Sequence, residues 1–584
     1  MRIKFKFLFA LPLLLSVTSC SSSDKISFQC SDYTFETYYN DKYFMGDNSV
    51  VSEEVALASH AMALATFNGN PDYTKRSFYL RDLWKKEGFE TIWFNDSFYE
   101  KPGTDTIGFG IASKTVQILG GTYSLIAIAV RGGNYDGEWT SNLTIGDSGD
   151  AKGFSEARDQ VITGLVNFIN NYKIEGNIKI WISGYSRAAI TSNMVAGKIL
   201  TDMKDGTYLT DKVSYRKQDI YAYCFEPPMG AYVPIEEARS DLYQGIHNFL
   251  NYNDFVPLVA PNEWGFVRFG TDHYYPDRLT DINFDETERE KMISLYHFTY
   301  GADKFPKYTV DDWKFFNAGD ELSKEHNLPI ESVNPSQGRF SRALIHEVAM
   351  EGIGSRYVYY FAIEAGLREL MKTVMGYNDE IGEIDFSNLI NVIFQYDFIV
   401  NLLNELKEGR SADFAEDIQP LFLQIFGANE KNIDVLTDLY LKNIILFSSL
   451  ANSFIDRPDV ANQLLFRDNA MGIAIGHMPE LSYAFLSACD SRIMGKKACK
   501  LNDGSYDTLH IESPVNFIIY EKTIKKEVFN YKDGVMNSSH LSAEKYADGS
   551  INIYLPKNGE YEYIGDIKES NRYNVDPLLG SAQG

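Results

Sequence analysis

The chain has 584 residues and a formal net charge of −25, with 80 Asp and Glu residues against 55 Lys and Arg. That charge disfavours binding to nucleic acid, or to anionic lipid through a basic face, so we expect no nucleic-acid partner. The length exceeds that of an average single domain, and we therefore expect the chain to divide into several.

The first twenty residues have the pattern of an export signal. Basic residues stand at positions 2, 4 and 6, and residues 7–17 are apolar but too short to span a bilayer as a mature helix. Val-Thr-Ser then precedes Cys20, and a polar run follows. The pattern resembles a bacterial lipoprotein signal peptide, which implies cleavage after residues 1–19, lipidation of Cys20 and a lipid-anchored place in the cell envelope, outside the cytoplasm. An ordinary secretory signal is the alternative. We interpret residues 20–29 as a polar tether.

Strand and helix patterns alternate through the first half of the chain. Apolar residues at helical spacing appear at 52–67, 154–172 and 188–200, and strand patterns appear at 106–116, 123–130, 178–182, 220–225 and 245–252. The run at 123–130 is almost wholly apolar, as in a central strand that is buried on both faces. Strands that alternate with helices predict a parallel sheet, and therefore an α/β core.

The pattern changes twice further along the chain. Residues 341–375, 386–408 and 433–454 are long helical patterns, so residues 281–469 are predicted to form an inserted helical domain. Short strand patterns return at 515–520, 550–556 and 559–563, with turns between them. We expect residues 511–584 to form a small C-terminal β domain that resembles a sandwich.

A nucleophile-elbow pattern stands at Gly184-Tyr185-Ser186-Arg187-Ala188. A short apolar strand leads into it and a helical pattern follows, and the small residues at 184 and 188 let the helix pack closely against the strand. Ser186 is therefore a candidate nucleophile, with a buried structural serine as the alternative. A second match at Gly153-Phe154-Ser155-Glu156-Ala157 has no strand before it, and we interpret Ser155 as structural.

A serine nucleophile needs a base and an orienting acid, which follow it in the order acid, then histidine. Asp254 lies in a polar turn after the apolar strand pattern at 245–252, although an aspartate that only forms an Asx turn fits there as well. Four histidines follow, and His297 and His346 lie in helical patterns typical of packing or surface residues. His273 and His477 lie in loops, where a catalytic ring has to be exposed above the sheet.

The cysteines leave one question open. Cys489 and Cys499 are close enough in sequence to pair across a loop in an oxidising compartment, and two free thiols are the alternative. The spacing between cysteines and histidines does not indicate a zinc site, so we expect no metal.

Six segments resemble, in the same order, those of class 3 (fungal-type) triacylglycerol lipases. They are 129–133 with Trp139, Gly153-Phe154, the elbow at 184–188, 225–230, 253–257, and His477 with Tyr483. The resemblance implies an α/β-hydrolase core over residues 30–280 and 470–510, with Ser155 in the helix before the elbow. It favours His477 as the base and leaves His273 as the alternative. It also implies an oxyanion hole formed by the backbone N–H groups of Gly133 and Arg187.

The sequence departs from that family around the elbow. Tyr185 stands where a histidine is usual, and Arg187-Ala188 stand where Leu-Gly is usual. The segment between the acid and the histidine is also much longer. Because the predicted helical domain at 281–469 lies within this segment, it should emerge over the active-site face as a cap or lid.

These patterns predict a serine hydrolase that cleaves carboxylic esters through a Ser186-His477-Asp254 triad without a cofactor. The resemblance points to a lipase acting on acylglycerols, and a carboxylesterase for non-lipid esters uses the same residues. A different class stays open at this stage: a non-catalytic, surface-anchored binding protein built on a hydrolase scaffold.

Overall fold

The computed structural model describes about half of the chain. The described residues are 24–30, 33–67, 77–100, 106–118, 120–132, 149–251, 254, 256–260, 264–275, 329–333, 477, 479–490, 492, 506–512, 514–539, 541–546, 548–557, 559–565 and 574–576. The signal at 1–19, the lipidation site Cys20 and most of the helical domain predicted at 281–469 lie outside these residues, so those predictions stay as they are.

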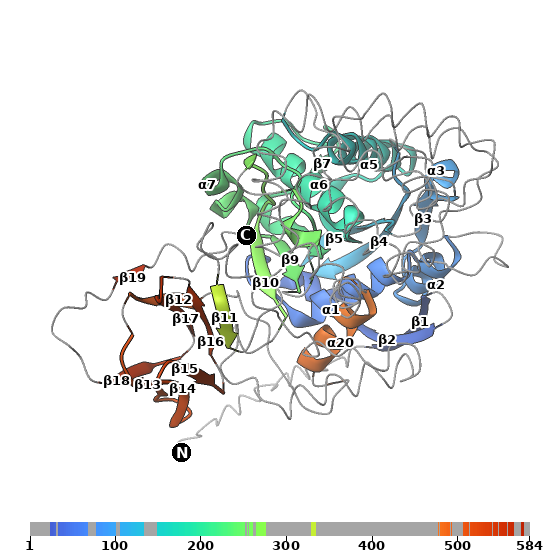
Figure 1. Ribbon diagram of the computed structural model, residues 1–584. Coiled ribbons are helices and arrows are strands. Elements are labelled where there is room, and N and C mark those ends of the chain that lie inside the picture. The colour runs from blue at the N-terminus through green and yellow to red at the C-terminus, as the bar shows by residue number, and fades with distance from the viewer. Residues whose placement is uncertain are drawn as a thin grey trace, which may run out of the picture.

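A mostly parallel sheet of eight strands forms the centre of the molecule (Figure 1). Its order is β10-β9-β8-β6-β5-β4-β3, with β7 beside β6. The strands from β5 to β10 run parallel, whereas β3 and β4 add an antiparallel edge. The strands are β3 (Thr91–Phe94), β4 (Phe109–Ile118), β5 (Gly121–Val130), β6 (Gly176–Tyr185), β7 (Val213–Ser214), β8 (Ile220–Phe225), β9 (Ile246–Leu250) and β10 (Thr271–Tyr274). The predicted α/β class with a parallel sheet is confirmed.

Helices cover both faces of this sheet. Helices α5 (Lys152–Asn171) and α6 (Arg187–Lys204) lie on one face, where they pack on alternate residues of β5 and β6 such as Ile126 and Ile180 (Figure 1). On the other face lie α1 (Glu53–Leu64), α2 (Phe78–Lys86) and α20 (Pro479–Cys489). Because α1 lies between the sheet and α20, it is buried almost all round and needs an apolar sequence on every side.

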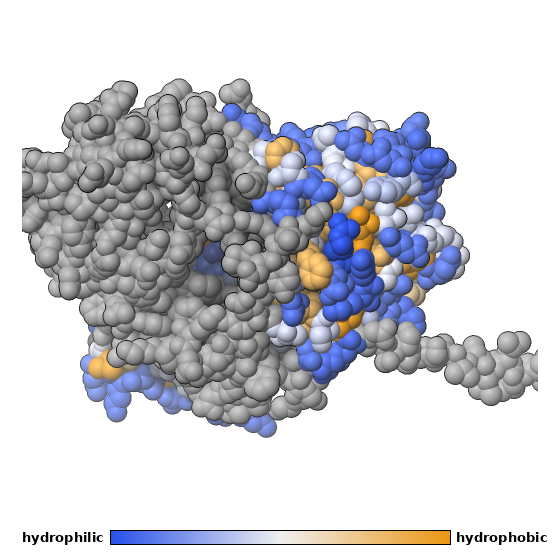
Figure 2. Space-filling model, turned by 90° about the vertical axis from the view of Figure 1, so that its right-hand side faces the viewer, coloured by the Kyte–Doolittle hydropathy of each residue, from blue (hydrophilic) through white to orange (hydrophobic). Residues whose placement is uncertain are grey.

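Short helices complete this part of the chain. They are η1 (Asp41–Met45), α3 (Asp96–Glu100), η2 (Lys217–Asp219), α7 (Ile235–Ala238), η3 (Asp241–Tyr243) and η4 (Val256–Leu258). Among the described helices, none combines the length and the apolarity that crossing a bilayer needs. Among the described residues on the face drawn in Figure 2, hydrophilic ones predominate and apolar ones lie between them.

The prediction of a tether over residues 20–29 is wrong from residue 24 onward. Strand β1 (Asp24–Cys30) forms an antiparallel hairpin with β2 (Tyr33–Tyr39). Side chains alternate along β1, with Ile26, Phe28 and Cys30 buried and the residues between them exposed. This period of two is typical of a half-buried strand, and the hairpin packs against α1. The core therefore begins at residue 24 rather than 30.

Two antiparallel sheets occupy the C-terminal region. One has the order β11-β16-β17-β12-β19 and the other β15-β14-β13-β18, and both contribute to a single cluster of buried side chains that includes Ile553 and Phe529. The strands are β11 (Pro329–Val333), β12 (Tyr506–Ile511), β13 (Phe517–Glu521), β14 (Lys526–Lys532), β15 (Val535–Ser538), β16 (Ser542–Tyr546), β17 (Ile551–Pro556), β18 (Tyr561–Gly565) and β19 (Asn574–Asp576).

Two predicted boundaries change as a result. The β region begins with β12 at residue 506, before the expected boundary at 511. The segment expected to be purely helical, 281–469, contributes strand β11, which pairs with β16 at the edge of the five-stranded sheet. Edge pairing of this kind joins segments that are distant in sequence, and no local pattern predicts it.

Candidate active site

Ser186 lies on a sharp turn between β6 and α6. Its backbone has φ 58° and ψ −126°, a strained conformation for a residue with a side chain. The turn requires small neighbours, since a Cβ atom on Gly184 would lie 2.4 Å from the carbonyl oxygen of Ala188. The backbone N–H of Ser186 donates to the carbonyl of Phe225, 2.9 Å away, which fixes the turn to the end of β8. The elbow predicted from the sequence is present.

Ser186, His477 and Asp254 meet at the C-terminal edge of the parallel strands. His477 Nε2 lies 2.9 Å from Ser186 Oγ, and His477 Nδ1 lies 2.5 Å from Asp254 Oδ2. The Asp254 side chain is fully buried, whereas 23 % of the His477 side chain is exposed. With the proton on Nδ1 held by the carboxylate, Nε2 is the acceptor for the serine hydroxyl. The structure thus brings together the three residues that the sequence singled out.

Asp254 also forms a turn with the residues that follow it. Its Oδ1 accepts from the N–H of Val256 at 2.9 Å, while Oδ2 faces His477. The Asx turn, first considered as an alternative to a role in the site, is therefore what fixes the carboxylate just beyond β9. An acceptor held by backbone in this way loses little freedom when it binds the imidazole.

The segment of His477 is held by the residue before the nucleophile. The hydroxyl of Tyr185 donates to the backbone carbonyl of His477 at 3.2 Å, and the two rings are 5.5 Å apart between centroids. Burial is the main cause that raises the pKa of Tyr185 well above its usual value, so the phenol stays a donor at any ordinary pH.

The rival residues lie elsewhere. His273 is buried in β10, where its Nε2 lies 2.9 Å from Nδ1 of His247, and His247 contacts the carbonyl of Asn48 through its other nitrogen. Ser155 lies in α5, the helix before the elbow, and its hydroxyl donates to the carbonyl of Lys152. The side chains of His273 and Ser155 therefore form structural contacts inside the fold rather than contacts with Ser186. His297 and His346 lie outside the described residues.

The predicted oxyanion hole is described only on one side. Arg187 is the first residue of α6, so its N–H stands at the helix N-terminus, where the helix dipole favours negative charge. Its guanidinium is buried, with Nη1 3.4 Å from the carbonyl of Thr106. Gly132 follows β5 and approaches the elbow so closely that a Cβ there would lie 2.8 Å from the Tyr185 carbonyl. Gly133 lies outside the described residues.

Sequence reasoning missed Glu226, the residue after β8. It is fully buried and has a positive φ of 50°. Its Oε2 accepts from the N–H of Asn251 at 2.9 Å, and its carboxyl is hydrogen-bonded to that of Asp254. Burial, and then the charge of Asp254, raise the pKa of Glu226 well above its usual value. A charged residue directly after the wholly apolar strand 220–225 is the signal that marked it.

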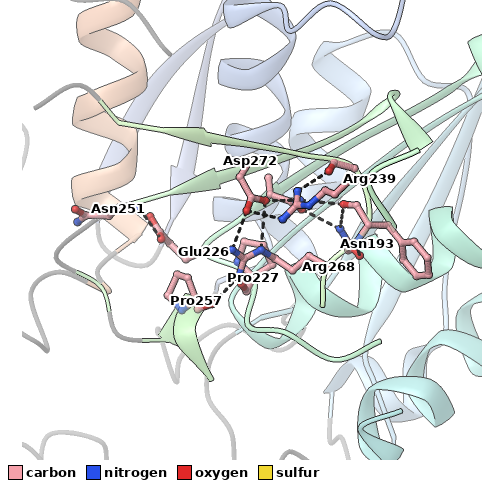
Figure 3. Close-up of polar contacts among 11 residues, drawn as sticks. Asn193, Glu226, Pro227, Arg239, Asn251, Pro257, Arg268 and Asp272 are labelled. Atoms are coloured by element: carbon pink, nitrogen blue, oxygen red, sulfur yellow. Dashed lines mark hydrogen bonds and ion pairs between the residues drawn. The ribbon is translucent and has the colours of Figure 1, made fainter. Parts of the chain in front are cut away.

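A buried ionic cluster supports the two turns that carry these carboxyl groups (Figure 3). Asp272 Oδ2 lies 3.0 Å from Arg268 Nη2 and 2.8 Å from Arg239 Nη2. Arg268 Nη1 in turn donates to the carbonyls of Pro227 and Pro257, which follow Glu226 and Asp254 by one and three positions. Burial alone would raise the pKa of Asp272, but the charges of Arg239 and Arg268 outweigh it and hold that pKa below its usual range.

Comparison with known proteins gives fold neighbours only. No protein-family model and no curated protein matches the chain. Among solved structures, the chain is similar to the lipase of Rhizomucor miehei in its native propeptide complex, at 15% identity and a TM-score of 0.27 over 44% of this chain and 86% of that one. It is also similar to a lipase from Rhizopus microsporus var. chinensis (12% identity, TM-score 0.26, 43% and 84%) and to lipase II from Rhizopus niveus (12%, 0.25, 38% and 79%). Function is therefore inferred from the geometry of the site.

Proposed function

We propose that the chain is a serine hydrolase that cleaves carboxylic esters. The hydrogen-bond chain from Ser186 through His477 to Asp254, which begins on a strained elbow, is the observation that carries the proposal. Strain at a nucleophile is expected where the turn has to expose a hydroxyl above the sheet.

The reaction would proceed in two steps. Ser186 Oγ attacks the ester carbonyl carbon while His477 Nε2 takes the hydroxyl proton, and the alcohol leaves with a proton returned by His477. Water then attacks the acyl carbon while His477 Nε2 takes one of its protons, and His477 returns that proton to Ser186 Oγ as the acid leaves. Asp254 keeps the imidazole in the required tautomer and stabilises the imidazolium. The N–H of Arg187 is proposed as one oxyanion donor and that of Gly133 as the other, each worth about 3 kcal/mol in the transition state.

The finer features of the proposal come from the sequence. Long-chain acylglycerols are the favoured substrates, with non-lipid esters as the alternative. Lipidation of Cys20 would hold the enzyme at a membrane outside the cytoplasm. Because β1 begins at Asp24, only residues 21–23 would separate that anchor from the folded core.

A fluorophosphonate probe tests the proposal directly, because it labels only an activated serine. The full chain purified in detergent should be labelled, Ser155→Ala should be labelled equally, and Ser186→Ala should not be. An unlabelled wild-type chain that is folded would favour the non-catalytic binding protein instead. Turnover of p-nitrophenyl esters of increasing acyl length would then separate a lipase, which prefers long chains, from an esterase.

A further inference from the structure

Glu226 is fully buried and is contacted from several elements. It follows β8, and it contacts the backbone N–H of Asn251 after β9 through Oε2 and the hydroxyl of Ser482 on α20 through Oε1, at 2.9 and 3.3 Å. Its carboxyl group is also hydrogen-bonded to that of Asp254. A buried carboxyl with this many partners has a single orientation, and that orientation faces the acid of the site.

The contacts of Glu226 close into a ring around the site. Asp254 contacts His477, and the carbonyl of His477 accepts from Tyr185. The hydroxyl of Tyr185 lies 3.4 Å from Ser482 Oγ, and the Ser482 hydroxyl donates to Oε1 of Glu226. The residue before the nucleophile, the acid and the base are thus joined a second time, through groups that would not contact the substrate.

The protonation state of the pair follows from its burial. Two carboxyl groups in contact in a buried site do not both ionise, because the second charge is opposed by desolvation and by the first. Asp254 faces the imidazole, so it is the partner that carries the charge. Burial and the charge of Asp254 raise the pKa of Glu226, which keeps the proton there.

We propose that Glu226 is a positioning residue of the proposed hydrolase, whose protonated carboxyl donates to Asp254 and, with Ser482 and Tyr185, holds the Asp254–His477 pair against Ser186. The inference rests on the proposed function. A neutral donor can fix the rotamer of Asp254 without adding negative charge beside the imidazole. An ionised Glu226 would repel Asp254 and disturb the pair.

Other charged or titratable groups face Glu226 and could affect its ionisation. Tyr185 at the end of β6 and Tyr275 after β10 both interact with its charge, and burial raises the pKa of each phenol well above its usual value. Arg268 binds the adjacent carbonyl of Pro227. The arginine is a permanent cation and the phenols stay neutral, so Glu226 is the group of this set whose ionisation would add negative charge beside Asp254 as the pH rises.

The test compares kcat, KM and pH profiles on a p-nitrophenyl ester, once fluorophosphonate labelling of the wild type has established the hydrolase. Failure of that labelling would remove the proposed function itself, before any variant is compared. Glu226→Gln keeps a neutral donor and should retain kcat within about threefold, whereas Glu226→Ala should lower kcat by about 10- to 100-fold with KM little changed, as for a small misplacement of reacting groups.

The pH profile separates positioning from a merely structural role. Wild-type kcat should fall at alkaline pH as Glu226 ionises, and Glu226→Gln should postpone that fall by at least one pH unit. Glu87→Gln, the same change at another buried carboxyl with a raised pKa, should leave the profile unaltered. Identical alkaline limbs of the kcat profile in wild type and Glu226→Gln would overturn the inference. An equal loss of kcat in Glu226→Gln and Glu226→Ala would overturn it as well. If Glu226→Ala does not fold, the pH profile of Glu226→Gln against that of the wild type decides between positioning and a structural role.

Discussion

The hydroxyl of Tyr185 donates a hydrogen bond to the backbone carbonyl of His477, 292 positions further along the chain. The residue before the nucleophile therefore holds the segment that brings the imidazole to Ser186. The tyrosine hydroxyl reaches across the site from the end of β6.

Tyr185→Phe should separate this hydrogen bond from the packing of the ring. The ring contacts with His60 and His477 would remain, so the free energy of unfolding should fall by only about 0.5–1.5 kcal/mol, the usual worth of one hydrogen bond. Ester turnover should fall by more than stability alone explains, since His477 would lose a constraint. Urea denaturation and kcat on the same preparation check this, and an unchanged kcat would contradict it.

Asp254→Asn should lower kcat by about 10⁴-fold with KM little changed, because an amide that donates to Nδ1 selects the wrong tautomer of His477. The Asx turn to Val256 uses Oδ1, and an asparagine can form the same turn, so the variant should fold. Steady-state kinetics on a short ester check the prediction. A loss smaller than tenfold in a folded variant would be incompatible with the proposed role of Asp254.

His477→Ala and His273→Ala form a matched pair. The first should abolish ester turnover, since no other base contacts Ser186 Oγ among the described residues. The second removes the β10 imidazole that contacts His247 on the neighbouring strand β9. It should lower stability, with kcat retained in the folded fraction. Turnover measured beside thermal unfolding distinguishes the two. Loss of turnover in a well-folded His273→Ala variant would point to a different base.

Asp272→Asn should destabilise the fold by about 3–5 kcal/mol at neutral pH, because the buried guanidinium of Arg268 and the partly buried one of Arg239 would lose their counter-charge. The pKa of Asp272 is depressed, so its stabilising contribution is present above the unfolded value of 3.8 and is lost as pH falls below it. The difference in the free energy of unfolding between wild type and variant should therefore become smaller in acid. Urea denaturation at pH 7 and pH 3 measures it, with the exposed Asp159→Asn as control.

Glu87→Gln should stabilise the protein selectively at alkaline pH. Burial raises the pKa of Glu87 from 4.5 to about 8, and Lys114 binds its carbonyl and Asp41 rather than its carboxyl. The stabilising contribution of the neutral acid is full below pH 4.5 and is lost as pH rises to about 8. The variant should gain up to about 4 kcal/mol at pH 9 and little at pH 5. A gain equal at both pH values would contradict the cause given.

The parts of the fold that local patterns encode were predictable. The strand at 220–225 agrees with β8, and the elbow follows from a strand, small residues two positions before and after Ser186, and a helix. Strand β1 was not predicted, because polar residues beside an export signal favour a linker. Its alternation of apolar and polar residues is nevertheless visible in the sequence. The position of Glu226 is marked by a charge after an apolar strand, but its contact with Asp254 could not be predicted. Strand β11 could not be predicted either, since it depends on pairing with a strand more than 200 positions away.

The packing of the N-terminal hairpin against α20 also determines when the site can form during synthesis. The hydroxyl of Tyr483 donates to the carbonyl of Glu36, and Tyr38 donates to the carbonyl of Arg492, so the first described strands hold the segment that follows His477. Ser186 leaves the ribosome 291 residues before His477, which at ordinary elongation rates is roughly 15 to 60 seconds. Throughout that interval a chain that already carries the elbow has no base beside its serine. An enzyme arranged in this way would stay inert towards esters at least until His477 has been made.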